Sequence, residues 1–338
     1  MSAKDQPLFE AFLNQHDDAK WDEAVRDLLP HIHEVDKTAT RIWFAFFPLA
    51  LSQAFDQAED PDKLAQKLVM EGKFRLKDQI DSSHKFVYGH RYWPEVKRAV
   101  AEYAASAKAP ASLDLALQIR QLAGEVAKKT GADESLLIGI TAIAFMTLQQ
   151  TGWEAFNASP GAVNLANKQA AKSPEKMLKA RARDDRQGPL NSFLGLKKGY
   201  TITFDENDRD AKFKLIETQH LTTAAAKDKR DFVSRDSRCT VNEGPIPVQC
   251  RAASCGTCWV GVLGGAEKLS PVDALERRRI KEFGYIDTEE EKPLIRLACQ
   301  AQAFGAVSLV IPPWNGVFGK FLRGHKSMLD EIEEVSRS

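Results

Sequence analysis

The sequence predicts an α+β fold in two parts, an all-α N-terminal domain followed by a smaller domain built on a sheet. Apolar residues recur at helical spacing through the first 185 residues, and alternation of apolar and polar residues begins only at residue 199. A polar stretch ending in Gly188-Pro189 separates the two patterns and is typical of a linker. We therefore expect a helical domain over residues 1–185, a linker over 186–198, a sheet-containing domain over 199–326 and an acidic tail over 327–338.

The first domain is expected to hold six helices, over residues 21–29, 39–55, 62–70, 92–105, 112–127 and 133–148. Pro48 should kink or break the second of them, because proline cannot donate the helical hydrogen bond. The fifth starts at Ser112, a plausible N-cap, and Gly131 follows its end. The sixth is apolar on nearly all sides, which is typical of a central core helix.

The second domain is expected to open with a β-hairpin, in which the strands 200–204 and 213–218 flank a turn-like stretch. A further strand is expected over 259–263 and a closing strand over 307–312. Between them, Ser270 as N-cap and Pro271 in the first turn predict a helix that runs to Phe283 and stops at Gly284.

Four of the five cysteines show a spacing that is typical of an iron–sulfur centre. Cys250, Cys255 and Cys258 form a C-x4-C-x2-C run, and Cys299 follows 41 positions later. A two-iron cluster needs four thiolates, two on each iron, and a tight loop whose backbone N–H groups face the sulfurs. We therefore predict that these four residues bind a [2Fe–2S] cluster.

Other interpretations of the cysteines are weaker. A structural zinc site usually takes its cysteines from two short-spaced pairs, and here the fourth cysteine stands alone. Disulfides need an oxidising compartment, and inert buried thiols have no reason to follow this spacing. Cys239 lies outside the pattern and is expected to be a buried structural thiol.

Two segments resemble the plant-type [2Fe–2S] ferredoxin family. They are Ile246-Pro-Val-Gln-Cys-Arg-Ala-Ala-Ser-Cys-Gly-Thr-Cys258 and Arg296-Leu-Ala-Cys-Gln300, within a region from about residue 199 to 320. The resemblance implies a β-grasp fold. The long, helix-bearing insert between the third and fourth cysteines resembles that of the Shethna-type protective ferredoxins of nitrogen-fixing bacteria. The N-terminal helical domain shows no resemblance of this kind.

The sequence departs from the family at two places. Position 253 is alanine where the family usually has glycine, which predicts a strained or rearranged backbone in the loop. The segment 222–242 is charged and carries Arg230, Arg235 and Arg238. We expect a surface loop there in place of the apolar helix that the resemblance implies.

The charge balance argues against nucleic-acid and membrane-surface binding, because 47 basic residues offset 47 acidic ones. From residue 198 to 326, 20 Lys and Arg face 17 Asp and Glu, a net of +3, so strong acidic steering of a partner is not expected. The N-terminus carries no signal-peptide pattern, and no apolar run reaches the ~20 residues of a membrane span. These observations predict a cytoplasmic protein.

Other candidate sites are less specific. His31, His33, His84 and His90 raise the question of a metal or haem site, but no Glu-x-x-His or Cys-x-x-Cys-His motif accompanies them. Exposed or capping histidines are the favoured interpretation. The chain has no Gly-x-Gly-x-x-Gly fingerprint and no P-loop. Trp259 is either a core residue or lies between the cluster and a redox partner.

The sequence therefore predicts a one-electron carrier whose helical domain docks a protein redox partner, either a reductase or an acceptor enzyme. One alternative is a protective or regulatory protein that binds an enzyme in a redox-dependent complex. Another is a redox sensor whose helical domain responds to the state of the cluster. A catalytic role of its own has the least support, because no acid–base or nucleophile constellation stands out.

Overall fold

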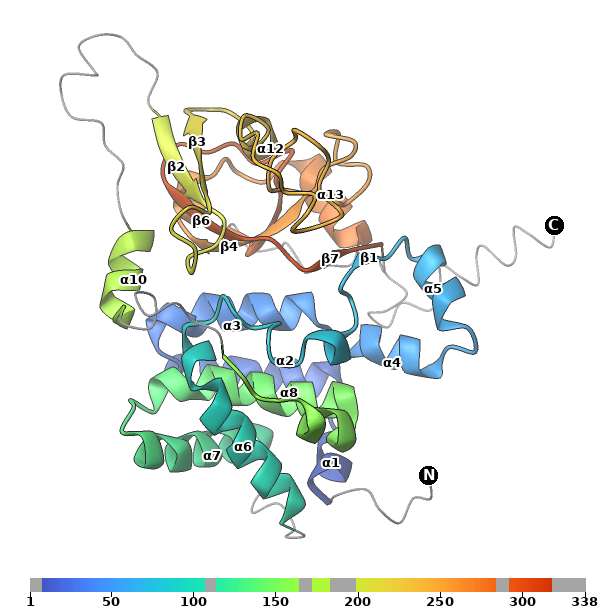
Figure 1. Cartoon of the computed structure of the whole chain (residues 1–338), viewed down its shortest axis with the longest axis vertical. Helices are drawn as coiled ribbons and strands as arrows, with labels where there is room; N and C mark the ends of the chain where they lie inside the picture. Colours follow the sequence, from blue (N-terminus) through green and yellow to red (C-terminus); the bar gives the residue numbers. More distant parts are fainter. Residues whose placement is uncertain (1–7, 107–113, 164–171, 183–198, 284–291, 318–338) are drawn as a thin grey trace. The chain divides into compact units, whose positions relative to one another are not determined.

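The computed structural model describes residues 8–106, 114–163, 172–182, 199–283 and 292–317 (Figure 1). The chain divides into two compact units. The first, the helical unit, comprises residues 1–53 and 75–175, and the second, the sheet unit, comprises residues 54–74 and 176–338. The sequence placed residues 54–74 in the helical domain, whereas they pack with the sheet unit.

The helical unit is organised around its longest helix, α8 (Ser135–Ala158). Every residue from Leu136 to Leu148 is buried, as predicted for a central core helix. Among the described residues of this unit, the other helices are α1 (Leu8–Leu13), α2 (Asp18–Leu28), α3 (Glu34–Phe46), the start of α4 (Leu49–Gln57), α6 (Trp93–Ala105) and α7 (Leu115–Thr130), with short 3-10 turns η1 (Leu29–His31), η2 (Leu76–Gln79) and η3 (Tyr88–Tyr92).

The helix ends follow local chemistry. The predicted break at Pro48 is confirmed, since α3 ends at Phe46 and α4 begins at Leu49. Helix α7 is capped by Asp114, whose carboxylate accepts a hydrogen bond of 3.0 Å from the Leu117 N–H, and Gly131 ends it at φ 69°. The predicted cap Ser112 lies outside the described residues.

Within the described ranges, α8 is long and apolar enough to cross a membrane by length and composition. However, 72% of its most apolar window is buried inside the fold, as expected of the helix at the centre of a helical core.

The sheet unit contains a five-stranded mixed sheet with the strand order β3-β2-β6-β4-β5. The predicted hairpin is confirmed by the antiparallel pairing of β2 (Gly199–Thr203) with β3 (Lys212–Ile216). Strand β2 runs parallel to β6 (Val307–Val310), which pairs antiparallel with β4 (Trp259–Gly264). Strand β5 (Ile295–Leu297) forms the other edge. Helices α12 (Leu221–Ala225) and α13 (Ala274–Phe283) and the turn η4 (Ala266–Lys268) belong to the same unit, as does most of α10 (Pro174–Arg181).

Helix α13 begins later than the sequence predicts. It starts at Ala274, and the Asp273 carboxylate accepts a 2.7 Å hydrogen bond from the Glu276 N–H. The hydroxyl of Ser270, the predicted N-cap, instead accepts from the Gln302 N–H. The prediction at Ser270 was therefore wrong, because a tertiary contact occupies its side chain. The predicted stop at residue 284 lies outside the described residues.

Residues 54–74 join the sheet unit through a second, two-stranded sheet. Helix α5 (Pro61–Lys67) leads into β1 (Glu71–Gly72), which pairs antiparallel with β7 (Trp314–Asn315). The Lys73 N–H also donates to the Pro313 carbonyl at 2.8 Å. Gly72 has φ 83°, and a Cβ there would lie 2.5 Å from the Pro313 oxygen, so this strand requires glycine.

Candidate metal centre

The cysteine loop runs directly into the sheet. Strand β4 begins one residue after Cys258, and its first residue, Trp259, pairs with Leu297 on β5. The Ala298 N–H donates to the Cys258 carbonyl at 2.9 Å. The β4–β5 ladder therefore places Cys299 beside Cys258, although the two are far apart in the sequence.

The four predicted ligands form two pairs of thiols. Cys258 and Cys299 are close enough to shift each other's pKa, and Cys255 lowers the pKa of Cys250. Electrostatic contacts link the pairs, between Cys250 and Cys299 and between Cys255 and Cys258. Cys258 and Cys299 are buried, whereas Cys250 and Cys255 are partly exposed. All five cysteines are free thiols, and Cys239 instead donates to the Pro245 carbonyl at 3.5 Å.

Hydrogen-bond donors surround the sulfurs. The backbone N–H groups of Ala252 and Ser254 lie 3.4 and 3.3 Å from the Cys250 Sγ. The Thr257 hydroxyl lies 3.2 Å from the Cys255 Sγ. The Gln300 Nε2 donates to the Cys299 Sγ at 3.3 Å. Donors in these positions stabilise thiolates, which is the form that binds iron.

Two of the predicted ligands, Cys250 and Cys299, have lowered thiol pKa values. Burial opposes ionisation of Cys250, but hydrogen bonds from Ser254, Ala252 and Cys255 outweigh it and lower its pKa to about 6. The hydrogen bond with Cys258 lowers the pKa of Cys299 to about 7.

The interaction with Cys299, together with burial, raises the pKa of Cys258. Cys299 is therefore the thiol of the two that ionises first. Burial raises the pKa of Cys239 to about 11, which keeps it a neutral thiol. This agrees with the prediction that Cys239 is a structural residue.

The loop backbone is strained where the sequence predicted it. Arg251 and Ala253 both have φ 56°, in the left-handed region that costs a side chain roughly 1–2 kcal/mol. Ala253 is 1% exposed, and its backbone N–H helps to lower the pKa of Cys299. Gly256 adopts φ 71° without this cost. The loop therefore accepts strain while it directs N–H groups at the sulfurs.

Residues 235–303 match the family model of the 2Fe-2S iron-sulfur cluster binding domain. The match includes all four predicted ligands and confirms the resemblance for this part of the chain. It also confirms a [2Fe–2S] cluster as the cofactor. The helical unit lies outside the match, and no solved structure matches the chain.

The arrangement of the thiols fits this cofactor. Cys250, Cys255, Cys258 and Cys299 lie close enough to shift one another's pKa. A cluster with two iron ions takes two thiolates on each, and these four side chains supply that number.

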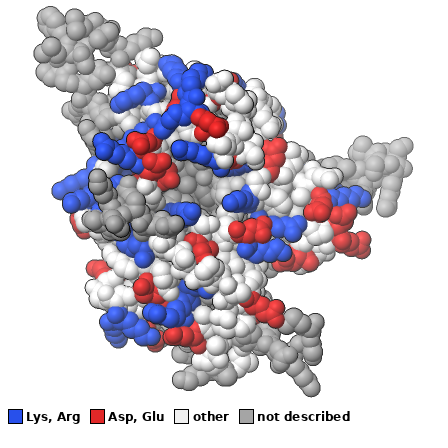
Figure 2. Space-filling view, in the orientation of Figure 1, with Lys and Arg blue, Asp and Glu red and all other residues white. Residues whose placement is uncertain are grey.

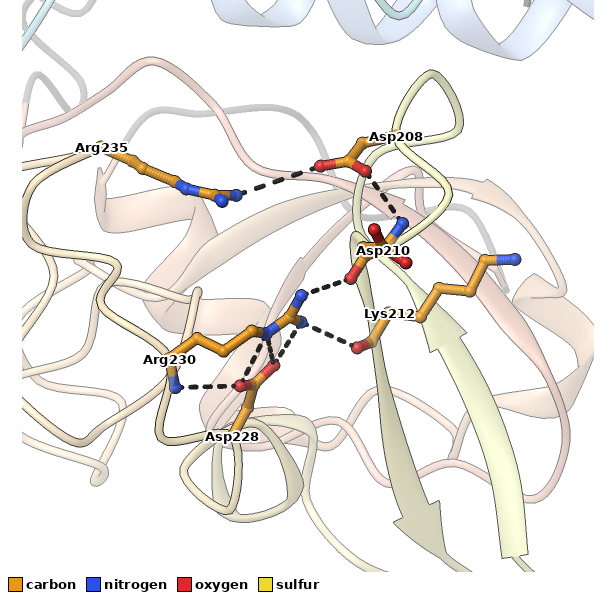
Figure 3. Close-up of polar contacts among 6 residues, drawn as sticks. All are labelled: Asp208, Asp210, Lys212, Asp228, Arg230 and Arg235. Carbon is orange, nitrogen blue, oxygen red and sulfur yellow. Dashed lines mark hydrogen bonds and ion pairs between the residues drawn. The ribbon is translucent and has the colours of Figure 1, made fainter. Parts of the chain in front are cut away.

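The charged segment that precedes the cysteine loop is held to the β2–β3 hairpin by hydrogen bonds and an ion pair (Figure 3). Arg230 pairs with Asp228 and donates to the carbonyls of Asp210 and Lys212 at 2.6 and 3.1 Å. Arg235 lies 4.0 Å from Asp208 on the same hairpin turn.

Arg238, whose side chain is 4% exposed, pairs with Asp236 and donates to the Pro312 carbonyl at 2.7 Å. Apart from the short helix α12 at its start, residues 222–242 form turns, as the sequence predicted. Each of the three arginines thus has a structural partner, which explains the charge of this segment.

Trp259 is a core residue with a defined partner. Its Nε1–H donates to the Trp314 carbonyl at 3.0 Å, and the two rings lie 4.9 Å apart. Both side chains are at most 1% exposed. Since Trp314 belongs to β7, the residue next to Cys258 is in contact with the strand that holds residues 54–74.

The histidines of the helical unit divide into two groups. His31 is exposed, and His33 caps α3 by accepting a 3.2 Å hydrogen bond from the Val35 N–H, in line with the favoured interpretation. For His84 and His90 that interpretation was wrong. Both are buried, and their Nδ1 atoms lie 2.8 Å apart in a hydrogen bond.

The surroundings of this pair are largely apolar. The His84 ring lies 4.0 Å from that of Trp93, and its Nε2 has no hydrogen-bond partner among the described residues. Sequence spacing did not reveal the burial, because the segment folds as turns and 3-10 helix and lacks a helical period.

Protonation of the pair should destabilise the helical unit. Burial lowers the pKa of His84 and lowers that of His90 to about 4. The unfolded chain, with a pKa near 6.5, therefore binds protons first as the pH falls. The free energy of unfolding should be highest above about pH 6.5 and should decrease toward pH 4. His90 alone should account for a decrease of about 3 kcal/mol.

Chemical unfolding followed by far-ultraviolet circular dichroism at pH 7.5, 5.5 and 4.5 measures this effect. A double variant, His84→Gln with His90→Gln, keeps side chains that can hydrogen-bond each other but removes the titration. The stability of this double variant should depend less on pH than that of the parent. An equal pH dependence in the double variant would contradict the assignment.

Proposed function

We propose that this protein transfers single electrons through a [2Fe–2S] cluster held by Cys250, Cys255, Cys258 and Cys299. The observation that carries the proposal is that the four thiols lie close together, with hydrogen-bonding groups at the sulfurs of Cys250, Cys255 and Cys299. The family match over residues 235–303 supports the same conclusion. When bound, the cluster supplies a centre that accepts and releases one electron.

The sheet supports a β-grasp fold for this unit. Its hairpin of β2 and β3 is joined to the last main strand, β6, by a parallel pairing with β2. Strands β4 and β5 complete the sheet, and α12 packs against β3. We infer that this is the β-grasp arrangement that the resemblance implies.

The protein's own residues set the conditions for electron exchange. Cys258 and Cys299 are buried, which keeps water from half of the centre. Cys250 and Cys255 are partly exposed, and Arg251, Ala252 and Ser254 beside them lie at the surface. Electrons should therefore enter and leave on the side of residues 250–255. The donors to Cys250 stabilise negative charge there when the centre is reduced.

Partner recognition is the role we propose for the helical unit. The sheet unit is close to neutral, and charges of both signs are interspersed on the face shown in Figure 2. Such a surface gives little electrostatic steering, so specificity for a reductase or acceptor enzyme has to come from shape and further contacts. We place this function in the cytoplasm, where free thiols persist.

A redox sensor is a second candidate, and one observation favours it. Trp259, next to Cys258, is hydrogen-bonded to Trp314, whose strand pairs with β1. Both ends of the segment 54–74 continue into the helical unit along the chain. A change around Cys258 therefore has a continuous path of packed residues to the segment that leads into the helices.

The reduction potential tests the proposed function. Ligation by four thiolates with no histidine favours the oxidised state, so we expect a midpoint of roughly −400 to −150 mV. Iron and sulfide analysis should give two of each per chain, and the reduced protein should show the electron paramagnetic resonance signal of a [2Fe–2S] centre. A positive midpoint, or one zinc ion and no sulfide, would refute the proposal.

A further inference from the structure

Helix α13, in the insert between the third and fourth cysteines, carries a buried carboxylate. Glu276 lies in the first turn of this helix, and its side chain is 1% exposed. Burial of a carboxylate is costly unless an opposite charge and hydrogen bonds compensate. The partners of Glu276 therefore show which part of the chain it fixes.

Those partners lie just before Cys299. Glu276 Oε1 and Oε2 accept hydrogen bonds from Arg296 Nε and Nη2, each at 2.9 Å, and the arginine side chain is 3% exposed. The backbone N–H of Leu297 also donates to Oε1, at 2.8 Å. One carboxylate thus fixes both a side chain and a main-chain N–H of the strand that leads to Cys299.

A second set of bonds holds the chain after Cys299. Ser270 exchanges two hydrogen bonds with Gln302, from the Ser270 N–H to the Gln302 carbonyl at 2.8 Å and from the Gln302 N–H to the Ser270 hydroxyl at 3.1 Å. Arg296 Nη1 donates to the Ser270 carbonyl at 2.9 Å, which connects this set to the ion pair. The residues on both sides of Cys299 are therefore attached to the insert.

We infer that Glu276 is a positioning residue for the fourth cluster ligand, which it holds through Arg296 and Leu297. Strand β5 has only three residues, so its ladder with β4 leaves Cys299 dependent on further contacts. The other three cysteines lie in one short loop, whose own N–H groups donate to Cys250. The inference rests on the proposed function, because it concerns the same centre.

The Glu276→Gln variant tests this role. Glutamine keeps the shape of the side chain but removes its charge and turns an amide toward the guanidinium. Loss of a residue that orients a ligand typically weakens metal binding 10–100-fold. We expect release of the cluster to a chelator to be faster by roughly tenfold or more, with a changed electron paramagnetic resonance signal. Glu282→Gln is the matched control, because Glu282 lies on the exposed face of α13, where it pairs with Arg279. This change should leave the rate of cluster release and the electron paramagnetic resonance signal unaltered.

A double variant, Glu276→Met with Arg296→Leu, separates positioning from simple stability. Apolar residues can replace a buried ion pair without loss of stability, but they offer no acceptor to the Leu297 N–H. We expect a protein that still folds, as judged by its far-ultraviolet circular dichroism, together with fast cluster release. This variant also carries the test if Glu276→Gln fails to fold.

If the double variant, or a folded Glu276→Gln protein, releases the cluster to a chelator at the rate of the parent, the inference is wrong. A parent protein with no [2Fe–2S] spectrum would instead refute the proposed function, so the two failures can be told apart.

Discussion

Replacement of Cys258 or Cys299 by serine should abolish the [2Fe–2S] spectrum, whereas Cys239→Ser should leave it unchanged. A hydroxyl is a poor ligand for iron in such a centre, and the two cysteines are buried, so no water or neighbouring side chain can easily replace the thiolate. Cys250→Ser and Cys255→Ser should also lose or destabilise the cluster.

The absorption spectrum between 300 and 600 nm, with iron and sulfide content, measures this result. Cys239→Ser is the matched control, because it makes the same chemical change in a buried thiol whose contact is the Pro245 carbonyl. Bleaching by Cys239→Ser together with an intact spectrum in Cys299→Ser would show that the ligands are wrongly assigned.

A fragment that begins near residue 190 should fail to form a stable sheet unit. The sequence placed a domain boundary in that region, but the fragment lacks residues 54–74, which supply β1. Loss of this segment uncovers β7 and removes Leu68, which is 7% exposed and whose carbonyl accepts from the Val317 N–H at 2.7 Å. Each buried apolar side chain of this size contributes about 1.5–3 kcal/mol, a large part of the 5–15 kcal/mol that is typical of a domain.

A point variant in the full chain tests the same contact. Gly72→Ala places a methyl group 2.5 Å from the Pro313 oxygen at φ 83°, so β1 should separate from β7 and the cluster should become labile. Gly131→Ala is the matched control, since its φ is 69° and nothing lies within 4 Å of the added carbon. That change should cost only roughly 1–2 kcal/mol, in the helical unit. A stable, cluster-containing fragment from residue 190 would show that residues 54–74 are dispensable.

Sequence reasoning located the candidate centre because the chemistry depends on spacing. Cys250, Cys255 and Cys258 lie close together in the chain, and the family's spacing led to Cys299 as well. Ala253 could be identified as a point of strain because the family usually has glycine at this place in the loop. The role of Glu276 could not, since its partner Arg296 is distant in the sequence and an acidic residue in a first helical turn is common.

The helices were predictable from their period, as the buried face of α8 shows. Strand β1 was not, because two residues cannot display an alternation, and its stability comes from β7 near the other end of the described chain. The burial of His84 and His90 was missed for a related reason, since turns and 3-10 helix carry no repeating apolar pattern.

The pairing of β1 with β7 also bears on the order in which the protein folds during synthesis. Glu71 leaves the ribosome 244 residues before Asn315, to which it is hydrogen-bonded in the finished structure. Residues 75–175, the second stretch of the helical unit, are synthesised after β1 and before β7. They can therefore fold while β1 is still unpaired. A folded helical unit shortens the flexible chain between the two strands and so reduces the entropy lost when they meet. Maturation of the iron–sulfur centre should accordingly follow the folding of the helices, and variants that slow the first unit should accumulate as chains without the cluster.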